Sequence, residues 1–203
     1  MNPLFLSRRR LLQLTALAPL AGCSLGGGAG PRTFELRPLS PAEATGPSWS
    51  LGIDPPHALK GLDTERIAYR NGPYEIEYYA DADWVDLAPD MVQMVLVRSF
   101  QNRSRLAVSE RTVGGTPPDF VLTSWLQDFQ AEAGKSAQVT LVASLSPASH
   151  RRTVRTRTFE ASAAAADDHI ESVVRAFDEA MGHVATDLIA WTLLTAEQEK
   201  REG

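Results

Sequence analysis

The sequence predicts an α+β domain in which two helices pack on a mostly antiparallel sheet, in the order β-β-β-β-α-β-β-β-α. Three observations predict it: short segments alternate apolar and polar residues, two segments carry the 3.6-residue apolar period of helices, and short turns join the last three strands. Hydrophobic residues make up 43% of the 203. A chain of this size and composition can bury a core without disulfides or metals.

The chain opens with the features of an export signal. Three arginines at 8–10 precede a short apolar run at 11–20, and no later run approaches the roughly 18 residues that span a bilayer. The next residues resemble a bacterial lipobox, in which the cysteine is linked to diacylglycerol and N-acylated after cleavage: Leu20, Ala21, Gly22 and Cys23. We therefore expect a signal peptide at 1–22 and a lipid anchor at Cys23. The alternatives are an ordinary signal peptide and a structural cysteine near the chain terminus.

The rest of the N-terminus bears on location. The arginines also resemble a twin-arginine signal, and twin-arginine and general export both stay open. Ser24 follows the cysteine where an aspartate would hold an enteric-type lipoprotein at the inner membrane. The resemblance thus favours the outer membrane, with the folded body in the periplasm. Residues 23–32 read as a lipidated flexible tether, 33–198 as the domain and 199–203 as a polar tail.

Charge and cysteine usage narrow the function further. Loss of the three leader arginines takes the 20 basic residues to 17, against 25 acidic residues, a formal charge of −8. Nucleic acid is therefore a poor partner for the mature body. Cys23 is the single cysteine, so its acylation leaves no thiol for metal or redox work.

The first half of the domain predicts four strands. Alternation predicts strands at 33–37 and 49–53, separated by a loop. A hairpin then joins 66–70 to 74–78, because Asn71-Gly72 supplies the positive φ angles that tight turns need.

A helix is expected next. Its apolar positions recur near the helical period: Trp84, Leu87, Ala88, Met91, Met94 and Val95. Asp83 or Asp86 can cap it, and it should run to about Asn102. A short strand at 106–108 can follow.

Three strands and a long helix complete the chain. In the first strand one face carries Val121, Thr123, Trp125, Gln127 and Phe129; in the second, Val139, Leu141, Ala143 and Leu145. The third runs over 154–159 and directs Arg155 and Arg157 outward. The last helix begins at a cap from Asp167 or Asp168 and ends near Thr195. Its apolar stripe holds Ile170, Val173, Val174, Phe177, Met181, Val184, Leu188 and Ile189.

The sequence contains few residues in a pattern typical of a catalytic or metal-binding site. The four histidines have no close metal-ligand spacing: His57, His150, His169 and His183. No nucleophile elbow, phosphate loop or zinc-protease motif is present. Asp81, Asp83 and Asp86 mimic a calcium loop over three positions but lack its glycine and distant glutamate, so we interpret them as capping residues. We expect no metal, no cofactor beyond the covalent lipid, and no enzyme.

Aromatic residues gather around the hairpin and the first helix: Tyr69, Tyr74, Tyr78, Tyr79 and Trp84. They fit core and cross-strand packing, or an exposed patch that docks a partner or a lipid tail.

The same region carries a family resemblance. The order of an early strand, an arginine-bounded strand, an aromatic pair and a tryptophan is similar to the ABC-type transport auxiliary lipoprotein family, which includes the paraquat-inducible lipoprotein group: Phe34-Glu35-Leu36, Arg66-Ile67-Ala68-Tyr69-Arg70, Tyr78-Tyr79 and Trp84. Ala68 and Val85-Asp86 depart mildly from the family pattern.

The resemblance implies a non-catalytic component of an envelope lipid-transport system. Its partners would be an ABC permease and ATPase and a substrate-binding protein of the mammalian-cell-entry type, and the resemblance makes a homo-oligomer plausible without fixing a subunit count. Two alternatives stay open. One is a lipid-binding module with an acyl cavity lined by residues such as Met91, Val95, Phe177 and Met181; the other, more remote, is a twin-arginine-exported enzyme.

Overall fold

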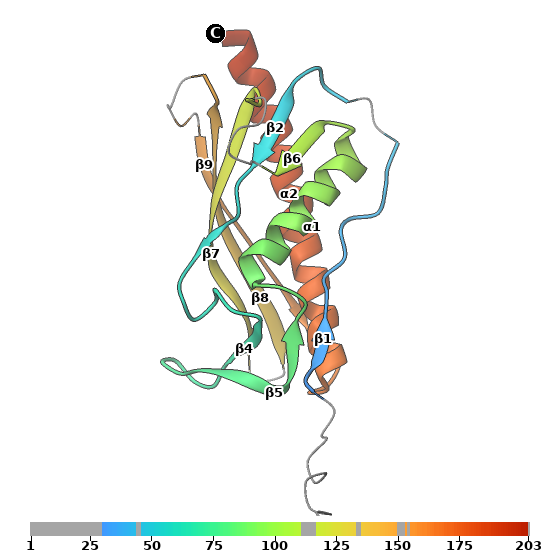
Figure 1. Cartoon of the computed structure of the whole chain (residues 1–203), viewed down its shortest axis with the longest axis vertical. Helices are drawn as coiled ribbons and strands as arrows, with labels where there is room; N and C mark the ends of the chain where they lie inside the picture. The colour runs from blue at the N-terminus through green and yellow to red at the C-terminus, as the bar shows by residue number, and fades with distance from the viewer. Residues whose placement is uncertain are drawn as a thin grey trace, which may run out of the picture. The chain divides into compact units, whose positions relative to one another are not determined.

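The computed structural model describes residues 30–43, 46–110, 117–132, 135–149, 153 and 155–202. The chain divides into two compact units, residues 1–30 and 31–203, and the helices and strands of the described part lie in the second. In this described part nine strands form one mixed sheet with two helices (Figure 1), which confirms the α+β class. Five strands precede the first helix, one more than predicted, and four lie between the two helices, of which the first is the short strand that the sequence offered at 106–108.

The three longest strands form the predicted antiparallel meander. β7 (Phe120–Glu132) pairs with β8 (Ser136–Pro147), which pairs with β9 (Arg155–Ala164). The predicted face of β8 is fully buried, at Val139, Leu141, Ala143 and Leu145. Arg155 and Arg157 are exposed, as expected.

The other edge of β7 corrects the expectation of a mostly antiparallel sheet. Three short strands pair with β7 in parallel, one after another: β2 (Ser50–Ile53), β3 (His57–Ala58) and β4 (Arg66–Arg70). β6 (Ala107–Glu110) is parallel to β2, and β1 (Arg32–Phe34) is parallel to β5 (Ile76–Trp84). Parallel strands that pair are joined by long connections, so the sequence contains no short turn that would predict their pairing.

β4 and β5 form the predicted hairpin. They pair antiparallel, and Gly72 in the connection has a φ of +95°, which glycine adopts without steric cost. The backbone N–H of Asn71 donates to the carbonyl of Glu75 at 3.2 Å and closes the loop.

α1 (Ala88–Ser104) begins four residues later than the Trp84 that the sequence predicts. Trp84 instead ends β5, where it pairs with Phe34 of β1. Asp83 also lies in β5, and Leu87 holds the N-cap position without a side-chain cap. The expected aspartate cap is therefore wrong. Asp86 accepts a hydrogen bond from the Leu87 N–H at 2.8 Å and so only supports the turn before the helix.

Arg105 caps the C-terminal end of α1, and its φ of 49° lies in the left-handed region. Arg105→Gly is expected to raise the free energy of unfolding by about 0.5–1 kcal/mol, because glycine adopts this helix-ending conformation without a Cβ clash. Urea denaturation followed by circular dichroism measures the change. Arg105→Ala is the control: it removes the side chain but keeps the strain, so an equal gain from alanine would contradict the backbone explanation.

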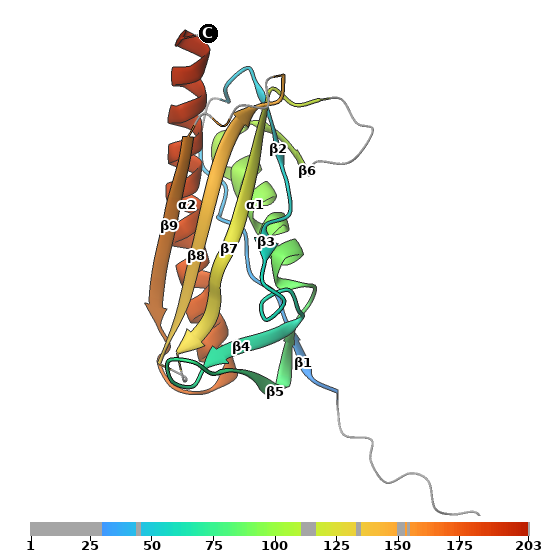
Figure 2. The ribbon, with the colours of Figure 1, turned by 90° about the vertical axis from the view of Figure 1, so that its left-hand side faces the viewer.

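α2 (Ile170–Glu202) covers the inner face of β8 and β9 (Figure 2). The predicted stripe lies on its buried side, with Ile170 and Val174 at the margin. Asp167 accepts a hydrogen bond from the His169 N–H at 3.1 Å, beside the helix start. The helix continues past Thr195, so residues 199–202, expected in a polar tail, are helical.

A β-bulge in β7 changes which face its side chains occupy. Leu126 pairs with Leu141 and Asp128 with Thr140, so Gln127 is the extra residue. Before the bulge, Val121, Thr123 and Trp125 share the outer face, as predicted, and Gln127 in the bulge is exposed. After the bulge the parity reverses, and Phe129 is buried at 1% exposure. The prediction that Phe129 shares the face of Trp125 is therefore wrong.

Three aromatic rings join the sheet to α2 in the core. The Trp84 ring centroid lies 5.5 Å from that of Phe129 and 5.2 Å from that of Phe177, and Phe129 and Phe177 are 5.0 Å apart. All three side chains are at most 2% exposed. Edge-on and tilted contacts of this kind add to the hydrophobic gain of burying the rings.

A candidate docking groove on the first helix

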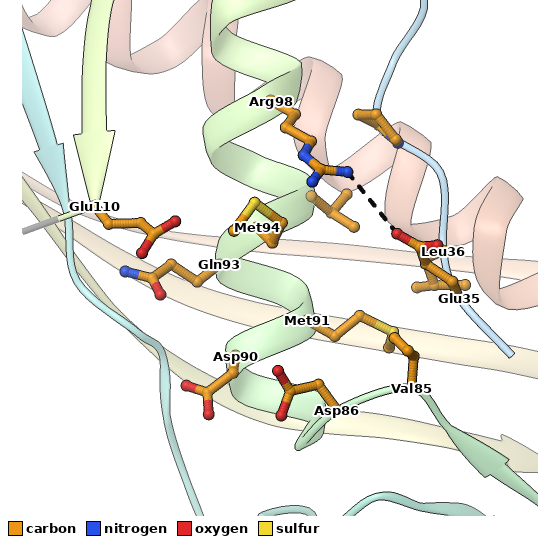
Figure 3. A pocket seen from close by; sticks show the side chains of 12 residues that line it. Glu35, Leu36, Val85, Asp86, Asp90, Met91, Gln93, Met94, Arg98 and Glu110 are labelled. Carbon is orange, nitrogen blue, oxygen red and sulfur yellow. Dashed lines mark ion pairs between the residues drawn. The ribbon is translucent and has the colours of Figure 1, made fainter. Parts of the chain in front are cut away.

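A groove runs over the outer side of α1, between the segment that follows β1 and the end of β6 (Figure 3). Its cavity volume is about 340 Å³. The residues that line this docking groove are Glu35, Leu36, Pro38, Val85, Asp86, Asp90, Met91, Gln93, Met94, Val95, Arg98 and Glu110. They come from three stretches that are distant in sequence, and α1 supplies six of them.

The helix supplies the groove floor by its own periodicity. Met91, Met94, Val95 and Arg98 follow the spacing i, i+3, i+4 and i+7, which places them on one side of a helix. Met91 and Val95 are buried, whereas Met94 is half-buried. Val85, just before the helix, is 55% exposed and extends the apolar surface. The groove thus presents apolar side chains to solvent.

Gln93 fixes the helix to the sheet beside the groove. Its Nε2 donates to the carbonyl of Ile53 in β2 at 2.8 Å, and the side chain is 7% exposed. A buried amide anchored in this way holds the helix in one rotational setting. The floor residues therefore face the groove in a defined register.

Carboxylates surround the apolar floor. Four acidic residues line the groove, at Glu35, Asp86, Asp90 and Glu110, against a single basic one, Arg98. Arg98 lies 3.9 Å from Glu35 and forms an exposed ion pair with it. Glu35 and Glu110 lie on opposite sides of α1, and Asp86 and Asp90 lie near its first turn (Figure 3). The groove is therefore negatively charged around an apolar centre.

Asp90 is the acidic residue whose ionisation the groove opposes most clearly. Burial raises its pKa, and the negative charges of Asp86 and Asp63 raise it further. The ionised Asp90 side chain therefore lowers the stability of the folded state. A cation placed beside it would relieve that cost.

Asp90→Asn is expected to make the protein more stable at neutral pH than the parent. A carboxyl with a raised pKa keeps its proton in the folded state over a range where the unfolded chain has lost it. Its contribution to stability therefore falls as pH rises from the ordinary aspartate pKa through the raised value. Urea midpoints of both proteins from about pH 4 to about pH 7 measure this. A difference that does not grow with pH would contradict the assignment.

The predicted aromatic patch is dispersed. Trp84 is 2% exposed and belongs to the core, whereas Tyr74, at the hairpin tip, is 98% exposed. Tyr78 lies under the Arg66 guanidinium, 4.1 Å from its ring centroid, and donates to the Gly61 carbonyl at 3.0 Å. Most of the cluster therefore packs internally, and Tyr74 alone of the five presents a fully exposed ring.

Two tyrosines pack together near the loop end of the hairpin, where Tyr69 pairs with Glu77. The rings of Tyr69 and Tyr79 lie 5.0 Å apart. The Tyr69 hydroxyl donates to Glu77, and Asn71 Nδ2 donates to the same carboxylate at 2.8 Å. These bonds lower the pKa of Glu77, and the bond to Glu77 raises the pKa of Tyr69. The network orders the hairpin that carries Tyr74.

The residues expected to line an acyl cavity do not share one. Met91 and Val95 line the docking groove, but Phe177 and Met181 are at most 1% exposed in the core under α2. Phe177 is in ring contact with Trp84 and Phe129. The space between helix and sheet at that point is filled by side chains.

The described histidines stand apart. His57 lies against Trp125 with ring centroids 6.2 Å apart; His169 lies beside Asp167, and His183 lies beside Glu179. Within the described ranges, no group of three or more His, Cys, Asp or Glu is placed to hold a metal ion. His150 and the predicted lipobox, Leu20 to Cys23, lie outside the described residues.

The sequence does not reveal the docking groove as a site. Met91 and Met94 indicate an adaptable helix face, and Asp86 is interpretable from sequence only as a capping residue. Glu35 and Glu110 join them through tertiary structure, because the chain after β1 and the end of β6 flank the same helix. In the described part of the chain, no helix is long and apolar enough to cross a membrane.

Comparison with known proteins places this fold in a family. The family model described as ABC-type transport auxiliary lipoprotein component matches residues 34–189 of this chain. Protein XCC0632 of Xanthomonas campestris, a DUF330 family structure, is 28% identical and superimposes with a TM-score of 0.73 over 85% of this chain and 99% of its own. A second solved structure, of an uncharacterised protein, shares the fold at 10% identity, with a TM-score of 0.64 over 79% of this chain and 97% of its own.

A longer relative is also similar. The uncharacterised protein bll6063 of Bradyrhizobium diazoefficiens is 31% identical over 176 residues, which are 83% of this chain and 47% of that protein. The chain thus spans about half the length of this curated relative. Because the family model covers most of the folded unit, from β1 into α2, the chain belongs to the ABC-type transport auxiliary lipoprotein family.

Proposed function

We propose that the mature chain is a lipid-anchored, non-catalytic auxiliary component of an ABC lipid-trafficking system. Its partners in this proposal are a substrate-binding protein of the mammalian-cell-entry type and the permease and ATPase of that system. The observation that carries the proposal is the family match over residues 34–189. The folded domain would dock the periplasmic assembly at the outer membrane, while the lipid on Cys23 holds it there.

The number of acyl chains on the cysteine supports the proposed anchoring. One chain binds a bilayer marginally and reversibly, whereas two or more hold it stably. A cysteine with both diacylglycerol and an N-acyl group would exceed that requirement. The domain itself would then need no membrane-spanning segment and could work entirely as a docking body.

Cys23→Ala is expected to release the protein from the membrane, because it removes the only acceptor for the lipid. Membrane fractionation on a sucrose gradient, with immunoblotting, measures the distribution. Ser24→Asp is the matched variant: it keeps the lipid and is expected to move the protein towards the inner membrane. Outer-membrane recovery of Cys23→Ala would contradict the anchor.

The partner is tested separately by purification of the lipidated protein from cells that express the transport system. A substrate-binding protein of the mammalian-cell-entry type, retained with its permease, is the expected result. Retention of unrelated envelope proteins alone would contradict the proposed function.

A further inference from the structure

The docking groove has the charge pattern of a site for a cation. Asp86, Asp90 and Glu110 add to Glu35, whose charge faces Arg98, the one basic lining residue. A phosphate or carboxylate ligand would meet an excess of like charge here, which disfavours it. A lysine or arginine side chain would instead meet carboxylates on more than one side of α1 (Figure 3).

The centre of the docking groove favours a ligand with apolar groups. Met91 and Met94 have flexible thioether side chains that adapt to different partners. Val85 and Met94 keep part of their apolar surface in contact with water, and covering that surface is favourable. A simple metal ion or a polyamine would leave this surface uncovered, so cationic charge alone does not fit the groove.

These two properties together select the occupant. We propose that the docking groove binds a segment of a partner protein in which apolar side chains cover Met94 and Val85 while flanking lysines or arginines face Asp86, Asp90 and Glu110. This inference deepens the proposed function and rests on it for the identity of the partner. Charge complementarity also favours a different protein over a second copy, since the mature chain has 25 acidic against 17 basic residues.

Site-specific photo-crosslinking in cells tests the inference on the full lipoprotein. The photoreactive residue p-benzoylphenylalanine replaces Met94 at the groove centre, and in the control it replaces Thr158, which is exposed on β9. The expected result is a crosslink from position 94, and not from 158, to an apolar segment of a transport-system protein with a lysine or arginine within about four residues, as one helical turn would place them. Mass spectrometry of the crosslinked peptide identifies the segment.

Charge is tested with two matched pairs of neutral variants. Asp86→Asn with Asp90→Asn is expected to lower the crosslink yield about threefold to tenfold, which corresponds to the loss of two partly exposed ion pairs. Glu179→Gln with Asp187→Asn removes the same charge from α2, outside the groove, and should leave the yield unchanged. Equal yields from the groove pair and the parent would overturn the inference.

Each other outcome is also decisive. Crosslinks to lipid, to a second copy of the chain or to an acidic segment would refute a basic partner segment. If the transport proteins co-purify but position 94 does not crosslink to them, the groove inference fails and the proposed function stands. If position 94 captures a basic, apolar segment of a protein unrelated to transport, the groove inference stands and the proposed function fails.

Discussion

Trp84→Ala is expected to lower the free energy of unfolding by about 3–5 kcal/mol, the usual cost of truncating a large buried aromatic residue. The side chain is 2% exposed and in ring contact with both Phe129 and Phe177. Its loss would leave a cavity where β5, β7 and α2 meet. Because a domain is stabilised by only about 5–15 kcal/mol in all, this one change approaches the limit of folding.

The same substitution at Trp125 is the matched control. Trp125 lies on the outer face of β7 and is 45% exposed, so Trp125→Ala removes less buried surface and should cost about 1–2 kcal/mol, well below the loss at Trp84. Urea denaturation followed by far-UV circular dichroism compares the two. Similar losses from both variants would contradict the placement of Trp84 in the core.

Deleting Thr123 is expected to destabilise the domain by about 4 kcal/mol or more, comparable to losing a large core side chain. Removal of one residue between Leu122 and the bulge reverses the facing of the strand before it. Phe120 and Leu122, which are 4% and 0% exposed, would turn outward, and Phe120 would lose its contact with Trp49 at 5.2 Å.

Deleting Gln127 should be far less costly, about 1–2 kcal/mol, because Gln127 is the extra residue of the bulge. Without it Leu126 and Phe129 both still face inward, and the strand loses only the local bend. Denaturant midpoints of the two deletion variants measure the difference. If the Gln127 deletion destabilises the domain as much as the Thr123 deletion, the alternation of inward and outward side chains does not shift at the bulge.

The sequence predicted the elements whose signals are local. The stripe from Ile170 to Ile189 identified α2, because apolar residues at helical spacing leave one face to bury. Asn71-Gly72 identified the β4–β5 hairpin, since its turn depends on neighbouring residues alone. The antiparallel meander of β7, β8 and β9 followed from short connections for the same reason.

The sequence placed Trp84 in the wrong element for a physical reason. Its spacing to Ala88 and Met91 suits a helix, but β1 pairs alongside β5 and holds Trp84 in extended backbone. Phe129 was assigned to the wrong face because strict alternation ignores a bulge, which becomes visible only when β8 sets the register. Tertiary pairing overrides local periodicity at both positions.

The docking groove also separates what the sequence predicts from what only the tertiary structure shows. The sequence by itself pointed to the family, because the family's short segments follow one another in a recognisable order along the chain, and it predicts an export signal from consecutive residues at its start. It could not assemble the groove, whose carboxylates Glu35, Asp90 and Glu110 come from three separate stretches. Only the tertiary structure decided that they surround one apolar helix face, because charge and apolar area combine into a site through space rather than along the chain.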